Sequence, residues 1–271
     1  MNLQEETEKL KNKGYNEDDA NARICQDIVL NGIALSGLSK NVTIKGGVVM
    51  RNISNNDRRA TQDADFDFIK YSISDESIRI FIQKISNAVN MKIEITGPII
   101  ELKHRDYQGK RVFIKIYDEF GYHLESKLDI GVHKDLDIKQ REYCFDICFQ
   151  DDGASLLMNT AEQILTEKLK SFLRFGVRST RYKDVFDIYF LANNVDYDLL
   201  MQCVDRYIFS DESLSVNTLQ DISKRIERVF TNKIFIANLK QSEKNWLDIE
   251  DDVVLTNNIN FVKSLVDRVT Q

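Results

Sequence analysis

The chain has 271 residues, of which 42% are hydrophobic and 30% are charged, which is enough for one large domain or two smaller ones. Its 43 acidic and 37 basic residues give a net charge of −6, which argues against a protein that coats nucleic acid without sequence preference. No apolar run approaches the length of a membrane span, and the polar first residues do not form a signal peptide. We therefore expect a cytoplasmic protein that does not enter a membrane.

The first third of the chain alternates helical and strand patterns. Apolar residues at helical spacing predict helices at residues 4–12, 18–36 and 75–89. A short strand is expected at residues 41–46, followed by a helix that begins directly after Gly46 and Gly47.

The middle of the chain is rich in strand patterns, and the last part is helical. The expected strands lie at residues 92–97, 99–104, 111–118, 123–132 and 143–149, and the segment Tyr-Gln-Gly-Lys at 107–110 is expected to be a turn. From about residue 155 the periodicity is helical. This order predicts an α+β fold, with a mixed sheet and flanking helices in residues 1–154 and a helical domain in residues 155–271.

The segment at residues 63–68, Asp-Ala-Asp-Phe-Asp-Phe, alternates charged and apolar residues as a half-buried strand does. In a strand, Asp63, Asp65 and Asp67 share one face and the residues between them face the core. Like charges at this spacing repel, and a divalent cation would remove the repulsion. The alternative is an edge strand whose polar face lies in water.

The two glycines before this strand predict an anion site. Gly46 and Gly47 would leave the backbone N–H groups at the start of a helix open to a phosphate. A phosphate site near an acidic strand is what nucleotidyl transfer needs, because metal ions on the carboxylates stabilise the attacking and leaving oxygens. A third carboxylate usually comes from a neighbouring strand, and Asp129, flanked by apolar residues, is the best candidate. Asp137 and Asp146 are weaker candidates by the same reasoning.

The order of these features resembles the polymerase-β-type nucleotidyltransferase superfamily. Within it, the Lys-Gly-Gly motif with Arg51, followed by Arg59, Thr61, Asp63 and Asp65, is similar to the AbiEii/AbiGii abortive-infection toxin family. The resemblance covers about residues 42–192 and includes the later segments at 162–172 and 181–189. One position departs from the pattern, because Val48 stands where the family usually has Ser or Thr.

In the helical part, Lys168 and the pair Asp184 and Asp187 are charged residues at positions that are expected to be buried. Lys168 falls inside an apolar stripe, where a lysine needs a partner or snorkels at the helix edge. Asp184 and Asp187 share one face of the next predicted helix and call for a cation, with Lys168 and Arg181 as candidates. The pairing could be a structural link between two helices. The resemblance instead implies that Lys168 contacts the triphosphate and that Asp184 orients it or activates the acceptor, with Asp187 structural.

The resemblance implies a toxin of a toxin–antitoxin or phage-defence system that transfers NMP from an NTP to an acceptor, with tRNA the first acceptor to test. Mg²⁺ or Mn²⁺ would be the cofactor, and a cognate antitoxin would be encoded nearby. The implied catalytic residues are Asp63, Asp65, Lys168 and Asp184, and the implied metal ligands are Asp63, Asp65 and Asp129. The implied nucleotide contacts come from Gly46, Gly47, Arg51, Arg59, Thr61 and Lys168.

Two other functions remain open. The loss of a hydroxyl at Val48 favours a module that binds NTP or GTP without transferring it. The shared core motif also allows a small-molecule nucleotidyltransferase of the antibiotic-modifying kind. Basic residues could line a groove for the triphosphate or an RNA end, although each one alone is better explained as solvated surface. They are Arg58, Arg59, Lys103, His104, Arg105, Arg174, Arg178, Arg181 and Lys183.

Overall fold

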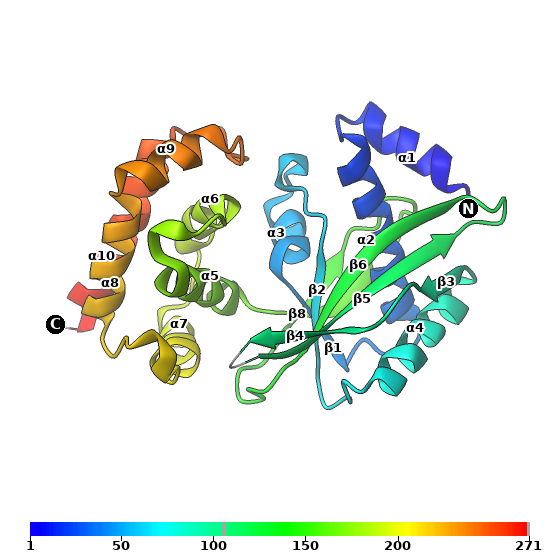
Figure 1. Ribbon diagram of the computed structural model, residues 1–271, viewed down its shortest axis with the longest axis horizontal. Helices are drawn as coiled ribbons and strands as arrows, with labels where there is room; N and C mark the ends of the chain where they lie inside the picture. The colour runs from blue at the N-terminus through cyan, green and yellow to red at the C-terminus, as the bar shows by residue number, and fades with distance from the viewer. Residues whose placement is uncertain (105–106, 270–271) are drawn as a thin grey trace. The chain divides into compact units, whose positions relative to one another are not determined.

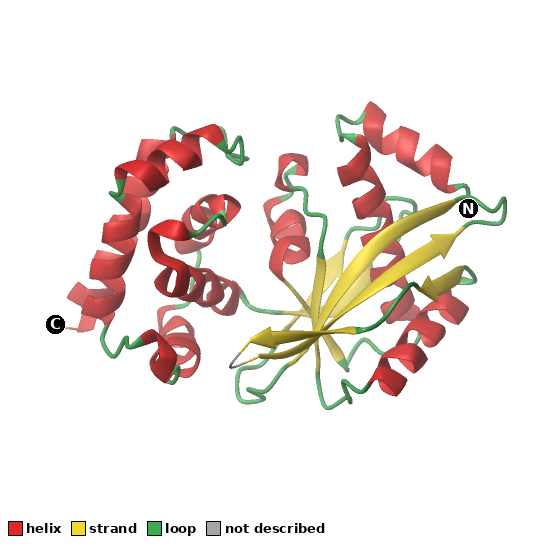
Figure 2. Cartoon of the chain, in the orientation of Figure 1, coloured by secondary structure: helices red, strands yellow, loops and turns green. Residues whose placement is uncertain are grey.

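The computed structural model describes residues 1–104 and 107–269, which separate into two compact units, Met1–Asn159 and Thr160–Gln271. The first unit contains a sheet with helices, and the second is helical (Figure 1, Figure 2). The predicted α+β class, a mixed sheet with flanking helices followed by a helical part, is confirmed.

Within the described residues, one sheet of eight strands forms the first unit, in the order β3-β5-β6-β2-β1-β8-β7, with β4 also paired to β5. The sheet is mixed, because β2 runs parallel to β6 and β1 runs parallel to β8, while the other pairs are antiparallel. The strands are β1 (Val42–Lys45), β2 (Ala64–Phe68), β3 (Lys92–Ile95), β4 (Ile100–His104), β5 (Tyr107–Tyr117), β6 (His123–Val132), β7 (Arg141–Phe145) and β8 (Ala154–Met158).

The helices of this unit begin at side-chain caps or at the glycine pair. Asn16 caps the second helix and Ser74 the fourth, each accepting a hydrogen bond from a backbone N–H of the first turn. The third begins at Gly46, immediately after β1. The helices are α1 (Leu3–Asn12), α2 (Glu17–Leu35), α3 (Gly46–Ser54) and α4 (Asp75–Val89).

The register of β2 positions the acidic residues. The Cα of Asp65 is paired with that of Lys45 on β1 and with that of Asp129 on β6. Phe66 and Phe68 are buried on the opposite face, where their rings lie 6.4 and 4.9 Å from the ring of Phe81 in α4. The alternation read from the sequence therefore separates an apolar face, covered by α4, from an acidic face.

Several elements differ from the sequence-based expectation. The apolar segment Ala154–Met158 is strand β8, paired between β1 and β7, and not the start of the helical part. A short apolar run fits either structure, so its periodicity did not identify it. The two compact units divide after Asn159, and the predicted domain boundary after residue 154 stays a prediction. The expected turn at 107–110 is the beginning of β5, and β7 ends at Phe145.

The second unit is built around an aromatic core. Its first helix begins with a capping box, in which the side chains of Thr160 and Gln163 each accept a hydrogen bond from the backbone N–H of the other residue. Phe172 lies with its ring centroid 5.1 Å from Phe230 and 6.0 Å from Phe235. None of the helices in residues 1–104 and 107–269 combines the length and apolar character that a bilayer crossing requires. The helices are α5 (Ala161–Phe175), α6 (Tyr182–Ala192), α7 (Tyr197–Val204), α8 (Leu219–Phe230), α9 (Lys233–Gln241) and α10 (Asp251–Val269).

Candidate active site

The glycine pair lets two polar side chains approach the start of α3. Gly46 has a φ of +64°, and a Cβ added to it would lie 2.6 Å from Oδ2 of Asp65. A Cβ on Gly47 would lie 2.4 Å from Oγ1 of Thr61. Both distances are shorter than any side chain tolerates, so only glycine permits the Asp65 carboxylate and the Thr61 hydroxyl at these places. The sequence associated the glycines with phosphate binding, and their close contact with Asp65 and Thr61 is an additional role.

Asp129 lies beside Asp65 and is bound by an arginine of the next strand. Arg111 donates from Nε and Nη2 to the two carboxylate oxygens of Asp129, both at 2.7 Å. The pKa of Arg111 is raised, first by this hydrogen bond, then by the charge of Asp129 and by the charges of Asp63 and Asp65. The positive charge of the Arg111 guanidinium therefore interacts favourably with all three carboxylates.

Two lysines neutralise the other aspartates of the acidic face. Lys127 Nζ lies 2.9 Å from Oδ1 of Asp63, and Lys45 Nζ lies 2.7 Å from Oδ1 of Asp67. Asp67 is 6% exposed, so its carboxylate is enclosed with its lysine. This pairing gives Asp67 a structural role that the spacing of the three aspartates did not reveal.

The donor chemistry of Asp63, Asp65 and Asp129 fits a hard divalent cation, since Mg²⁺ prefers carboxylate oxygens. In the structure, however, no group of three or more His, Cys, Asp or Glu side chains within the described residues is arranged to receive a metal ion. Arg111 and Lys127 supply the positive charge instead. A cation at these carboxylates would therefore have to replace at least the Arg111 contact.

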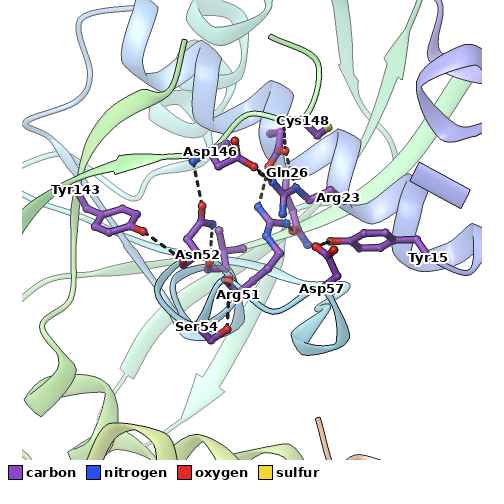
Figure 3. Close-up of polar contacts among 12 residues, drawn as sticks. Tyr15, Arg23, Gln26, Arg51, Asn52, Ser54, Asp57, Tyr143, Asp146 and Cys148 are labelled. Carbon is purple, nitrogen blue, oxygen red and sulfur yellow. Dashed lines mark hydrogen bonds and ion pairs between the residues drawn. The ribbon is translucent and has the colours of Figure 1, made fainter. Parts of the chain in front are cut away.

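The side chain of Arg51 points into the protein, which argues against its predicted phosphate contact; that contact stays a prediction. Arg51 is 3% exposed; Nη1 donates to Oε1 of Gln26 at 2.5 Å and Nη2 to Oδ1 of Asp27 at 2.8 Å (Figure 3). Arg51 lies one helical turn after the buried Val48, so both face the interior of the unit. Burial lowers the pKa of Arg51, and the charge of Asp27 opposes that shift.

The other residues of the motif, Arg59, Thr61 and Val48, differ in how far their side chains are buried. Arg59 is 3% exposed and donates from Nη1 to the carbonyl of Ala60 at 3.5 Å, and this burial argues against a nucleotide contact. Thr61 is half-buried with its hydroxyl beside Gly47, so its predicted nucleotide contact stays a prediction. Val48 is 1% exposed, which leaves backbone N–H groups as the polar groups of the first turn of α3.

In the helical unit, Lys168 of α5 binds both aspartates of α6. Its Nζ lies 2.6 Å from Oδ1 of Asp184 and 2.6 Å from Oδ2 of Asp187. Asp187 is fully buried and also accepts a hydrogen bond at 3.1 Å from Nε1 of Trp246. Arg181 is farther from Asp184, at 3.8 Å. This geometry is that of an ion-pair link between two helices, and the catalytic roles of Lys168 and Asp184 stay predictions.

The expected basic groove would draw on both units and also stays a prediction. Arg59 is buried and so does not fit an open groove, whereas Arg174 is exposed and paired with Asp211 at 2.7 Å. Arg105 lies outside the described residues, as do the side chains of Lys103 and His104.

Sequence reasoning missed several residues that contact the acidic site. Lys127 could have been found, because it alternates with Asp129 on the same face of one strand. Arg111 and Gln26 carry no such signal, since their partners lie on other strands or loops. Gln26 is one of several polar residues of α2, which also include Arg23 and Asp27, and the sequence pattern does not single it out.

Comparison with known proteins adds the family. The profile described as "Nucleotidyl transferase AbiEii toxin, Type IV TA system" matches residues 28–259, a span that includes the glycine turn, the acidic strands and the Lys168 pair. A search of curated proteins gave no match. The matched span covers most of the chain, and the family implies a cognate antitoxin. The chain thus belongs to the AbiEii family of nucleotidyltransferase toxins of type IV toxin–antitoxin systems.

Proposed function

We propose that the protein transfers NMP from an NTP to a hydroxyl acceptor in a reaction that depends on Mg²⁺ or Mn²⁺. The acceptor oxygen attacks the α-phosphorus, and the bond from that phosphorus to the bridging oxygen breaks. Pyrophosphate leaves with the electron pair, and the acceptor proton is released to water. The first acceptor hydroxyl to test is that of a tRNA 3′ end.

The observation that carries this proposal is the approach of Asp65 to the start of α3. The close contact with Gly46 brings a carboxylate beside backbone N–H groups that attract an anion. In the register of β2 and β6, Asp65 is directly opposite Asp129. A bound divalent cation would neutralise phosphate charge at this place. Asp63, Asp65 and Asp129 would bind it, and Gly46, Gly47 and Thr61 would contact the phosphates.

A transfer assay tests the proposal. Purified protein is incubated with Mg²⁺, total tRNA and each α-³²P-labelled NTP in turn. Label on tRNA that disappears in the Asp63→Ala/Asp65→Ala variant is the expected result. A Ser215→Ala variant, which changes an exposed turn residue of the helical unit, serves as the matched control and is expected to label tRNA like the wild type. No label on tRNA or on small acceptors, with NTP binding intact, contradicts the transferase.

A second function has one observation in its favour. Val48 is buried and offers no hydroxyl at the third position of the turn, so only backbone donors remain there. We propose as the alternative a toxin that binds NTP and acts by binding a partner, without group transfer. Equilibrium dialysis with GTP and ATP would support it if binding persists while the transfer assay gives no product.

A further inference from the structure

The segment that precedes the acidic strand is fixed from the protein interior. Residues 60–63 have no regular structure, yet Asp63 must be placed as accurately as the strand residues if it is to bind a cation with Asp65. Thr61 is held on one side by its contact with Gly47. On the other side, the side chain of Gln26 in α2 donates from Nε2 to the carbonyl of Thr61 at 2.7 Å and lies 3.4 Å from the carbonyl of Asp63.

Arg51 determines which way the Gln26 amide points. A guanidinium has only donors, so the atom of Gln26 that faces Arg51 must be the oxygen. The amide nitrogen is then directed to the carbonyl oxygens of Thr61 and Asp63, which are acceptors. Because Gln26 is 1% exposed, water is not available to replace either partner. The orientation therefore follows from the chemistry of both neighbours.

Arg51 is itself fixed by a buried ion pair. Asp27 is fully buried and accepts hydrogen bonds from Arg51 at 2.8 Å, from Nε of Arg23 at 2.7 Å and from the backbone N–H of Cys148 at 2.9 Å. Arg23 in turn donates to Asp146 at 2.7 Å (Figure 3). A charge network with this many partners does not reorient easily, so it provides a rigid base for Gln26.

We infer that Gln26, oriented by Arg51, is a positioning residue that sets the backbone of Thr61–Asp63 and with it the Asp63 carboxylate for the divalent cation. The role of the cation rests on the proposed function, whereas the effect on the backbone does not. Arg51 thereby acts on the acidic site through Gln26, without touching a phosphate. Partners that orient a metal ligand commonly change metal affinity by about 10- to 100-fold when they are lost.

The test replaces only the donor half of the amide. In Gln26→Glu the carboxylate still accepts from Arg51, but an oxygen now faces the two carbonyl oxygens and repels them. Tyr143→Phe is the matched control, because it removes another hydrogen bond to α3, from Tyr143 to the carbonyl of Asn52, that does not lead to residues 60–63 (Figure 3). If Gln26→Glu does not fold, Gln26→Asn, which is neutral and withdraws the amide, takes its place.

Two measurements are made on the full chain. They compare wild type and variants whose thermal midpoints match that of the wild type. Hydrogen–deuterium exchange of peptides covering residues 57–66 reports the backbone, and a Mn²⁺ titration by electron paramagnetic resonance reports the cation. We expect faster exchange in this segment and about tenfold weaker Mn²⁺ binding in Gln26→Glu, with both unchanged in Tyr143→Phe.

The outcomes separate this inference from the proposed function. Unchanged exchange at residues 57–66 in the Gln26 variant overturns the positioning role. Faster exchange with unchanged Mn²⁺ affinity overturns the link to the cation. If wild type and the Asp63→Ala/Asp65→Ala variant bind Mn²⁺ equally while the Gln26 variant still exchanges faster, positioning is upheld and the proposed metal dependence fails.

Discussion

Arg111 binds both oxygens of Asp129 from the adjacent strand, and it carries a pKa raised further by Asp63 and Asp65. A guanidinium thus lies where three carboxylates would share a divalent cation. Its charge and the charge of a cation are alternatives for the same carboxylates, so the two should compete.

Arg111→Gln is expected to bind Mn²⁺ more tightly than the wild type, by about tenfold (roughly 1.4 kcal/mol), because the variant removes a like charge near the cation. The thermal midpoint without cation should fall, since the carboxylates then repel one another, and it should rise more steeply with added Mg²⁺. Mn²⁺ titration and thermal melts over a Mg²⁺ series give both quantities.

The control for this variant is Lys115→Gln, which breaks a salt bridge of 2.9 Å to Glu125 on the same pair of strands. It should leave Mn²⁺ affinity unchanged. Weaker Mn²⁺ binding in Arg111→Gln would mean that the arginine orients Asp129 for the cation and does not compete with it.

Gly46→Ala should destabilise the first unit and displace Asp65. Its φ of +64° costs a side chain about 1–2 kcal/mol, and the approach to Asp65 Oδ2 adds overpacking of about 1–3 kcal/mol. Gly37→Ala is the matched control, because Gly37 also has a positive φ, +74°, but an added Cβ meets nothing within 4 Å. Urea unfolding followed by circular dichroism compares them, and equal losses in the two variants would refute the close approach.

Lys168→Met should strongly destabilise the helical unit. It leaves Asp184 and Asp187 buried without their shared cation, a change that costs about 3–5 kcal/mol. The only tryptophan, Trp246, donates to Asp187, so its fluorescence follows this unit during unfolding.

Two further lysine variants separate structure from catalysis. Lys170→Met should cost about 1 kcal/mol or less, because Arg174 remains as a partner of Asp211. Lys168→Arg keeps the charge, so stability should largely return. Transfer activity that also returns with arginine would argue against a specific contact between Lys168 and the triphosphate.

The four cysteines should differ sharply in reactivity. Burial raises the pKa of the Cys25 thiol to about 12, and burial together with the nearby Asp27 charge raises the pKa of Cys148. Cys203 is fully buried, while Cys144 is exposed. Iodoacetamide at about pH 8 should therefore modify Cys144 first, as mass spectrometry of peptides would show. Early modification of Cys25 would indicate that the first unit opens locally.

Periodicity predicted much of the fold because it reports which face of an element is buried. The alternation at residues 63–68 placed Phe66 and Phe68 in the core and Asp65 on the opposite face. The same reasoning failed for Ala154–Met158, because a five-residue apolar run has no distinguishing period.

The candidate site was predictable only where a single segment defines it. Gly46, Asp63 and Asp65 follow one another closely, so their order in the chain indicated their proximity. Arg51 was assigned to phosphate because its motif places it near the glycines, but its position on α3 directs it to Gln26 and Asp27 of α2. The pairing of Arg111 with Asp129 depends on strand register, which one sequence does not reveal.

The junction between the units uses consecutive residues for two different purposes. The backbone N–H of Asn159 donates to the carbonyl of Ile44 on β1, and its side-chain oxygen accepts a hydrogen bond from the Thr43 hydroxyl. The next residue, Thr160, caps α5 together with Gln163. No residue separates the strand bond from the helix cap. Chimaeras that exchange the helical unit between relatives should accordingly keep Asn159 with Thr43 and move Thr160 together with Gln163, so that each matched pair is inherited whole.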